Sequence, residues 1–323
     1  MSLTGHLKSK DSPVREFFLT NFPGTKRALQ ACALQPTAFD VRVSSPALPD
    51  GKLPPTWRGS DPVVVPGSQE SFPWATAGTA FDYRLRFYFG ADDLTKLVAY
   101  HGSIRLMDYW GPGAPPLAFD QLLDEFTSLK ESEPDWGRKP SPDARKRLAQ
   151  MSYVLALFEQ CFRTSIMPEW PIARLGPGAS YDLILSTAHD SLVSDIEALA
   201  QLFEANQPTL LNAGKVELNP TFGETSYLLG GADADLIVDG RLLDIKTKMA
   251  ASIDRVDLWQ ILGYALADTD DEFDIREVGF YFSRQGVQVS WDLGALLSLL
   301  SESSQDLAAS RARFGEVLEG LPR

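Results

Sequence analysis

Two short apolar-rich runs lie on either side of the dipeptide Asp239-Gly240. Asp-Gly between two such runs is typical of a two-residue hairpin turn. A tight turn sets the register, because antiparallel pairing advances by one residue on each side of it. The predicted cross-strand pairs are Val238 with Arg241, Leu236 with Leu243, and Asp235 with Asp244. Two carboxylates would therefore face each other across the hairpin.

Side-chain alternation places the charged residues of this hairpin on one face. The predicted polar face carries Asp233, Asp235, Asp244 and Lys246, and the opposite face, expected to be the core, carries Leu236, Val238, Leu243 and Ile245. Directly opposed carboxylates lie about 5 Å apart at Cβ and repel each other. We therefore expect a cation between them; the alternative is a charged hairpin exposed to solvent.

A hard divalent cation suits two neighbouring carboxylates. Mg²⁺ typically takes one or two carboxylates and fills its other positions with water and substrate phosphate, which Asp235 and Asp244 would allow. Such a cation stabilises charge on a phosphodiester and lowers the pKa of a bound water. Lys246, as a neighbouring point charge, would orient that water or neutralise the developing negative charge.

The segment that follows, residues 254–267, has the apolar periodicity of a helix and opens with Asp254, a residue type favoured at helix N-caps. Gln260 and Tyr264 are four residues apart and therefore share one helical face. There, an amide and a phenol would contact a substrate backbone or hold the lysine. The alternative is that Tyr264 is a core aromatic with Gln260 at its edge.

With these residues in place, residues 190–292 resemble a PD-(D/E)XK nuclease, most similar to the RecB and Cas4-like branch. In that branch an acid on one strand, an acid-x-Lys on the next and Gln-x-x-x-Tyr on the following helix form the site. The resemblance implies Asp235 as the first acid, Asp244 and Lys246 as the acid-x-Lys, Gln260 and Tyr264 as the helix motif, and the backbone carbonyl of Ile245 as a third metal contact. Asp233 competes with Asp235 for the first position. The implied cofactor is Mg²⁺ or Mn²⁺, and the implied activity is phosphodiester hydrolysis.

The wider pattern predicts a helix over residues 189–206, strands over 216–222, 226–238, 241–248, 275–283 and 287–291, and a closing helix over 292–314. We therefore expect an α/β fold with a mixed sheet and a restriction-endonuclease-like αβββαβ core over residues 186–323. A largely helical, loop-rich region over residues 1–185 would form a lid or accessory subdomain. Helices are expected there over 78–89, 119–129 and 143–163, and a loop-rich excursion over 33–73.

A further acid often joins the metal site in this family. The acids that could approach the hairpin are Asp82, Asp195, Glu197 and Glu217, and spacing does not separate them. Asp82 stands in Gly78-x-x-x-Asp82, where some RecB-like nucleases carry Gly-x-x-x-His. A solvated surface position is the alternative for each.

The cysteines, the histidines and the apolar runs of the sequence give no sign of a disulfide, a zinc site or a membrane span. The two cysteines, Cys32 and Cys161, lie in apolar helical surroundings without CxxC spacing, so we expect reduced core residues of a cytoplasmic protein. Zinc is not expected, because the sequence has no Cys/His cluster. No apolar run approaches the roughly 20 residues that span a bilayer.

The formal net charge of −13 opposes strong binding to long duplexes. A local basic cluster is formed by Arg138, Lys139, Arg145, Lys146 and Arg147; it would contact a phosphate backbone or be a solvated helix start. The expected partner is a nucleic acid, DNA in preference to RNA, in a short, single-stranded or partner-delivered form. The competing hypothesis is a catalytically silent scaffold of the same fold that binds nucleic acid or protein.

Overall fold

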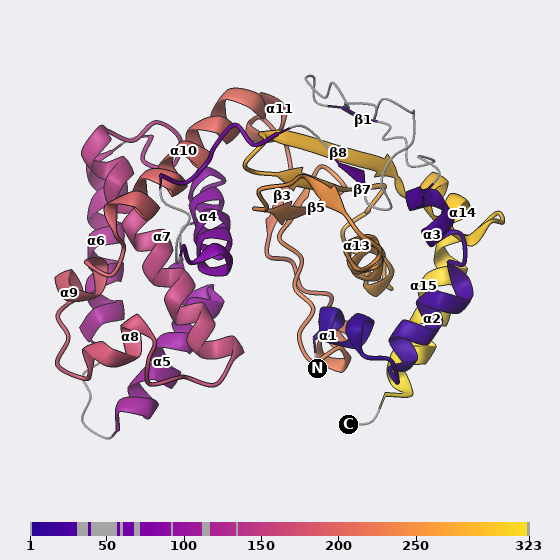
Figure 1. Ribbon diagram of the computed structural model, residues 1–323, viewed down its shortest axis with the longest axis horizontal. Helices are drawn as coiled ribbons and strands as arrows, with labels where there is room; N and C mark the ends of the chain where they lie inside the picture. The colour runs from indigo at the N-terminus through magenta and orange to yellow at the C-terminus, as the bar shows by residue number, and fades with distance from the viewer. Residues whose placement is uncertain are drawn as a thin grey trace. The chain divides into compact units, whose positions relative to one another are not determined.

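The computed structural model describes residues 2–30, 38–39, 57–58, 61–67, 72–91, 93–111, 117–133 and 135–321. The chain divides into two compact units (Figure 1). The first unit is Met1–Val63 with Asn206–Arg323, and the second unit is Val64–Ala205. Cys32 and most of the loop-rich excursion predicted over residues 33–73 lie outside the described residues.

The first unit is a mixed α/β structure, as the sequence predicts. Its strands are β1 (Ala38–Phe39), β2 (Trp57–Arg58), β3 (Val216–Leu218), β4 (Leu236–Val238), β5 (Arg241–Lys246), β6 (Ser252–Ile253), β7 (Glu277–Phe282) and β8 (Val287–Asp292). Its helices are α1 (Leu3–Lys8), α2 (Pro13–Asn21), α3 (Thr25–Gln30), α11 (Pro208–Leu211), α12 (Gly223–Leu228), α13 (Arg255–Ala267), α14 (Leu293–Ser301) and α15 (Leu307–Glu319). Six strands form one sheet in the order β1-β8-β7-β5-β4-β3, and β2 pairs with β6.

The predicted hairpin is confirmed at β4 and β5. Its register pairs Leu236 with Leu243 and Val238 with Arg241. Asp239 and Gly240 have φ values of 48° and 76°, the left-handed backbone that a two-residue turn of this type requires and that Asp-Gly tolerates. The side chain of Asp239 also accepts hydrogen bonds from the backbone N–H groups of residues 214 and 215, which join the turn to the segment before β3.

One predicted strand and one predicted helix differ from the structure. Of the strand predicted over 226–238, only β4 forms, at residues 236–238; before it the chain forms α12 and then turns at Gly230 and Gly231, both with positive φ. Ser226 closes this turn, because its hydroxyl accepts from Phe222 N–H and donates to the Ala232 carbonyl. The closing helix predicted over 292–314 is two helices, α14 and α15, separated at Glu302, which has left-handed backbone.

Helix α13 connects β5 to β7, which pair in parallel as neighbours in the sheet. It packs against both strands (Figure 1). Its first turn is a capping box, in which Asp254 accepts from the N–H groups of residues 256 and 257 while the Asp257 side chain accepts from Asp254 N–H. This double cap satisfies N–H groups that a helix start otherwise leaves unpaired.

The N-terminal helices belong to the first unit, not to an accessory region over residues 1–185. Helix α1 packs on α13, α2 on α15, and α3 on α14 (Figure 1). Phe18 stacks near Trp259 with 5.6 Å between ring centroids, and Trp259 donates to the Thr25 hydroxyl at 3.1 Å. The difference arises because the outer surface of α13 is also apolar, and α1–α3 bury it.

The second unit is helical. Its elements are α4 (Trp74–Tyr88), η1 (Leu94–Lys96), α5 (Val98–Trp110), α6 (Leu117–Ser132), α7 (Pro142–Arg163), α8 (Pro171–Leu175), α9 (Tyr181–Leu185) and most of α10 (Asp190–Asn206). The helices predicted over 78–89, 119–129, 143–163 and 189–206 are therefore confirmed. Ser141 caps α7 by accepting from Ala144 N–H, with Pro142 in the first turn. Cys161 lies buried in α7 as a free thiol, and burial raises its pKa to about 11.

Candidate functional site

Most of the predicted site residues meet at the C-terminal end of β5 and along α13. Asp244 and Lys246 lie on β5, where Asp244 is only 5% exposed. Asp235 immediately precedes β4, and its Oδ2 accepts a hydrogen bond of 2.7 Å from the backbone N–H of Ile245. The hairpin therefore holds the side chain of the first acid against the strand that carries the second.

Lys246 is the centre of the cluster. Its Nζ lies 2.8 Å from Asp244 Oδ2 and 3.1 Å from Asp257 Oδ1, and it donates to Gln260 Oε1 at 3.4 Å. Burial disfavours the ammonium charge, but Asp244 and Asp257 outweigh that effect and raise the pKa of Lys246 above its ordinary value. The lysine is therefore cationic at neutral pH.

Gln260 and Tyr264 continue the chain of contacts along α13, on one face as their spacing predicts. Gln260 Nε2 donates to the Tyr264 hydroxyl at 3.1 Å. Burial raises the pKa of Tyr264, and the negative charges of Asp244, Asp235 and Asp233 raise it further. The phenol therefore keeps its proton, and that proton remains available for donation, because the bond from Gln260 uses an oxygen lone pair.

The polar face of the hairpin is not separate from the core, which differs from the prediction. Leu242 shares the face of Asp244 by alternation and pairs with Ile237, and both belong to the main apolar cluster of the first unit together with Phe280. Leu236 and Leu243, on the other face, are buried as well. The carboxylates thus lie at the margin of the core, where a charge costs more than at a solvated surface.

Asp257 is a site residue that the sequence analysis missed. It lies in the first turn of α13, ion-pairs with Lys246, and pairs through its other oxygen with Lys248 at 2.8 Å. Burial opposes its charge, yet Lys246, Lys248 and the Asp254 N–H lower its pKa below the ordinary value. Its spacing was a usable signal, since residues 257, 260 and 264 recur on one helical face.

Three of the upstream acids that the sequence leaves open, Asp82, Asp195 and Glu197, lie in the second unit. Asp82 ion-pairs with Arg86 one helical turn later, and Asp195 is buried in α10. Glu217, on β3 of the first unit, lies 3.6 Å from Lys215 at a half-exposed position. Asp257 is thus the additional acid that the structure brings to Lys246.

The basic cluster pairs largely with acids of the second unit. Arg145 lies 3.7 Å from Glu197, Lys146 lies 3.3 Å from Asp190, and Arg147 pairs with Glu125. Intramolecular pairing reduces the charge that these three cations could offer to a phosphate backbone. The structure therefore differs from both expectations, the phosphate-binding cluster and the solvated helix start, because acids of α6 and α10 pair with these residues.

Glu197 makes the stability of the second unit depend on pH near neutrality. It lies between Arg84 and Arg145, and burial raises its pKa to about 7 although both arginines oppose the shift. Because the folded-state pKa exceeds the ordinary value of 4.5, the native protein binds the proton more tightly than the unfolded chain does. This contribution is fully present below pH 4.5 and is lost as the pH rises through 7, by about 3 kcal/mol at most.

Glu197→Gln should remove this dependence. We expect the free energy of unfolding of the wild type, relative to that of the variant, to fall between pH 5 and pH 8, as measured by urea unfolding at each pH. A difference between the two proteins that does not change across this range would contradict the assignment. The absolute offset between them reflects the lost ion pairs and does not enter the comparison.

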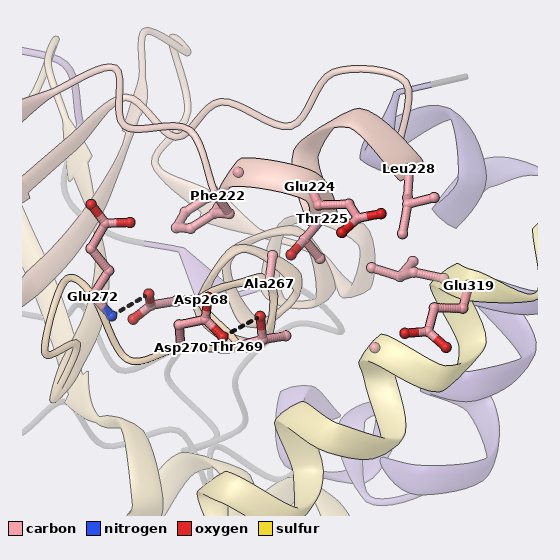
Figure 2. Close-up of a pocket in the computed structure, with 13 residues that line it drawn as sticks. Phe222, Glu224, Thr225, Leu228, Ala267, Asp268, Thr269, Asp270, Glu272 and Glu319 are labelled. Atoms are coloured by element: carbon pink, nitrogen blue, oxygen red, sulfur yellow. Dashed lines mark hydrogen bonds between the residues drawn. The ribbon is translucent and has the colours of Figure 1, made fainter.

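A pocket of about 220 Å³ lies beside the site in the first unit (Figure 2). It is lined by Phe222, Gly223, Glu224, Thr225, Leu228, Ala267, Asp268, Thr269, Asp270, Glu272, Gly315, Leu318 and Glu319. Figure 2 shows the carboxylates of Glu224 and Glu319 on facing sides of this pocket. Phe222 connects it to the site by stacking on Tyr264, with 6.1 Å between ring centroids. Its acidic lining disfavours phosphate, so we place the candidate chemistry at Lys246 instead.

The oxygen donors at the hairpin suit a hard cation. Within residues 2–321, apart from the segments not described, no group of three or more His, Cys, Asp or Glu side chains is arranged to hold a metal ion. Mg²⁺ needs only one or two carboxylates, however. Asp244 Oδ2 is buried and receives no directed hydrogen bond, because its contact with Lys246 is an ion pair outside hydrogen-bond geometry. That oxygen, Asp235 and the Ile245 carbonyl are the donors that would hold a divalent cation.

Comparisons of the chain with protein-family models, with curated proteins and with solved structures found no match. Among the helices described, none is long and apolar enough to cross a membrane. The geometry around Lys246 therefore carries the functional assignment.

Proposed function

We propose that this protein is a divalent-metal-dependent nuclease with a PD-(D/E)XK, restriction-endonuclease-like core, similar to the RecB and Cas4-like branch. The single observation that carries the proposal is the convergence on one ammonium: Lys246 contacts Asp244 of its own strand and Gln260 of α13, and Gln260 in turn contacts Tyr264. The strand order supports it, since β3, β4 and β5 are antiparallel neighbours and β7 follows α13 in parallel with β5.

In this proposal, metal binding and charge stabilisation belong to different residues of the chain. Asp235, Asp244 and the Ile245 carbonyl would hold Mg²⁺ or Mn²⁺, which when bound supplies Lewis-acid charge to the scissile phosphate and acidifies water. Lys246, kept cationic by its neighbours, stabilises the negative charge that develops on the phosphoryl oxygens as water attacks phosphorus and the P–O ester bond breaks. Because it is already protonated, it serves as a charge and a donor and not as the base.

Gln260 and Tyr264 position these groups. Gln260 holds Lys246 through its amide oxygen and Tyr264 through its amide nitrogen, so the two side chains keep a set separation. The protonated Tyr264 hydroxyl is a donor for a non-bridging phosphate oxygen. The net charge of −13 favours a short, single-stranded or partner-delivered substrate over a long duplex.

The direct test is cleavage. Purified protein with Mg²⁺ or Mn²⁺ is expected to cut single-stranded DNA or RNA oligonucleotides, followed by gel electrophoresis, and EDTA should stop the reaction. Asp244→Asn is the matched variant, because it keeps the size of the side chain and removes its charge. Equal behaviour of the wild type and this variant, across single- and double-stranded DNA and RNA, would refute the proposal.

A catalytically silent scaffold is the second candidate. The observation in its favour is that Lys246 already balances Asp244 and Asp257, as an internal cation would. Calorimetric titration with Mn²⁺ separates the two candidates. Absence of binding at millimolar metal favours the scaffold, whereas binding that Asp244→Asn weakens supports the nuclease.

A further inference from the structure

The Lys246 ammonium has as many close acceptors as it has N–H groups. An ammonium carries three donors, and three oxygens lie within 3.4 Å of Nζ, one each from Asp244, Asp257 and Gln260. Of the three contacts, the one with Gln260 is a hydrogen bond, and those with the two carboxylates are ion pairs outside hydrogen-bond geometry. Together the three oxygens occupy the space around Nζ that a substrate phosphate would need. One of the three acceptors must therefore release the lysine before it can act on another molecule.

The side chains that carry these three oxygens differ in how firmly their other contacts fix them. Asp244 and Asp257 both contact Lys246 as ion pairs, and Asp244 Oδ2 is the oxygen that would also hold a cation. Asp257 is held from two other sides, because its Oδ2 accepts from Asp254 N–H at 3.0 Å and from Lys248 Nζ at 2.8 Å. Its position in the capping box of α13 gives it little freedom to move.

We propose that Asp257 is a positioning residue that anchors the Lys246 ammonium when the Asp244 carboxylate binds a divalent cation. A dication on Asp244 repels a neighbouring ammonium, and without a second anion the lysine would swing away from the site. Asp257 and Gln260 together hold Nζ in place. The side of the ammonium that Asp244 vacates is then free for the phosphate. This role rests on the proposed nuclease function. It adds an account of how Lys246 leaves Asp244 and contacts the substrate phosphate.

The test first uses the metal-free protein. Asp244→Asn imitates an Asp244 whose charge is neutralised, and the ¹⁵N-correlated NMR signal of the Lys246 ammonium reports whether the group is still held, since only a held ammonium exchanges slowly enough to be seen. We expect this signal to persist in Asp244→Asn and to disappear in the double variant with Asp257→Asn. Persistence in the double variant, at the intensity seen in Asp244→Asn alone, would overturn the anchoring role.

The second arm uses cleavage of a fluorescent single-stranded oligonucleotide and calorimetry with Mn²⁺. Asp257→Asn keeps the capping oxygen and removes the charge; it is expected to lower kcat and Mn²⁺ affinity by about 10- to 100-fold with KM unchanged, as for other groups that orient metal-site residues. Asp257→Glu keeps both charge and cap and should restore most of the loss. Lys248→Met removes the other cation on Asp257 and should leave Mn²⁺ affinity within about threefold of the wild type.

The outcomes of the two proposals are distinct. A wild type that binds Mn²⁺ and cuts, with an equally active Asp257→Asn, overturns the anchoring role and leaves the nuclease proposal standing. A wild type that neither binds Mn²⁺ nor cuts refutes the nuclease and with it the metal-dependent role of Asp257, and a Lys246 signal that still depends on Asp257 then shows a structural ion pair only. Because partial unfolding of Asp257→Asn would also lower the apparent kcat without changing KM, kcat is calculated for the folded fraction, which circular dichroism measures.

Discussion

Lys246→Met is expected to abolish cleavage and to lower the free energy of unfolding of the metal-free protein by about 3 kcal/mol. The lysine lies between two carboxylates that are almost fully buried, with side-chain exposures of 7% for Asp244 and 11% for Asp257. Removing one member of a buried ionic cluster is costly, because the partner charges remain in a poorly solvated position. Loss of one preorganised donor at a developing charge costs a further factor of about 100 or more in kcat.

Urea unfolding followed by circular dichroism measures the first effect, and the oligonucleotide assay measures the second. Lys215→Met is the matched control in the same unit, because Lys215 pairs with Glu217 at 3.6 Å with both side chains about half exposed. Such pairs contribute about 0–1 kcal/mol, so this variant should keep its stability and its activity. We also expect Mn²⁺ to stabilise Lys246→Met more than the wild type, since a dication can take the vacated position. A stable, fully active Lys246→Met would contradict the assignment of the site.

Gly102→Ala is expected to destabilise the second unit by about 3 kcal/mol or more, without any change at the candidate site. Gly102 lies where α5 crosses α7, and a Cβ built there would be 1.7 Å from the Phe158 carbonyl oxygen. The obstacle is helix backbone, which a rotamer change cannot move, so the two helices would have to separate and expose the apolar residues between them.

Hydrogen exchange measured by mass spectrometry localises this effect, because protection should fall in α5 and α7 and stay unchanged in α13 and β5. Gly178→Ala is the control in the same unit, since its Cβ would meet no atom within 4 Å. That variant should remain within about 0.5 kcal/mol of the wild type. Equal stability of the two glycine variants would show that α5 and α7 are not packed as closely as described.

The hairpin and the face shared by Gln260 and Tyr264 were predictable because both follow from rules of short range. Left-handed backbone at Asp239 and Gly240 sets the register of β4 on β5 within a few residues. The 3.6-residue period of a helix sets which side chains share a face. No homologue was needed for either, and the cap at Asp254 followed in the same way.

Other features depend on contacts between distant parts of the chain, and the sequence analysis missed or misassigned them. Asp257 reads as an ordinary N-terminal acid of a helix until β5 places Lys246 beside it. For the basic residues near the start of α7, the sequence leaves open a phosphate-binding cluster or a solvated helix start, and only the fold shows that acids from other helices pair with them. The strand predicted over 226–238 failed because Gly230 and Gly231 adopt positive φ, where a turn replaces strand pairing.

Local preferences along the chain were therefore enough to predict an α/β core, its hairpin register and two of the three residues that contact Lys246, Asp244 and Gln260. The partners of each apolar face were not predictable in this way, because hydrophobic burial is non-directional and any apolar stripe can cover any other. Folding alone brings α1–α3 onto α13, α14 and α15, across more than 200 residues of sequence, as in the hydrogen bond from Trp259 to Thr25. It also places the site at the margin of that shared core, where burial strengthens the pull of the acids on Lys246.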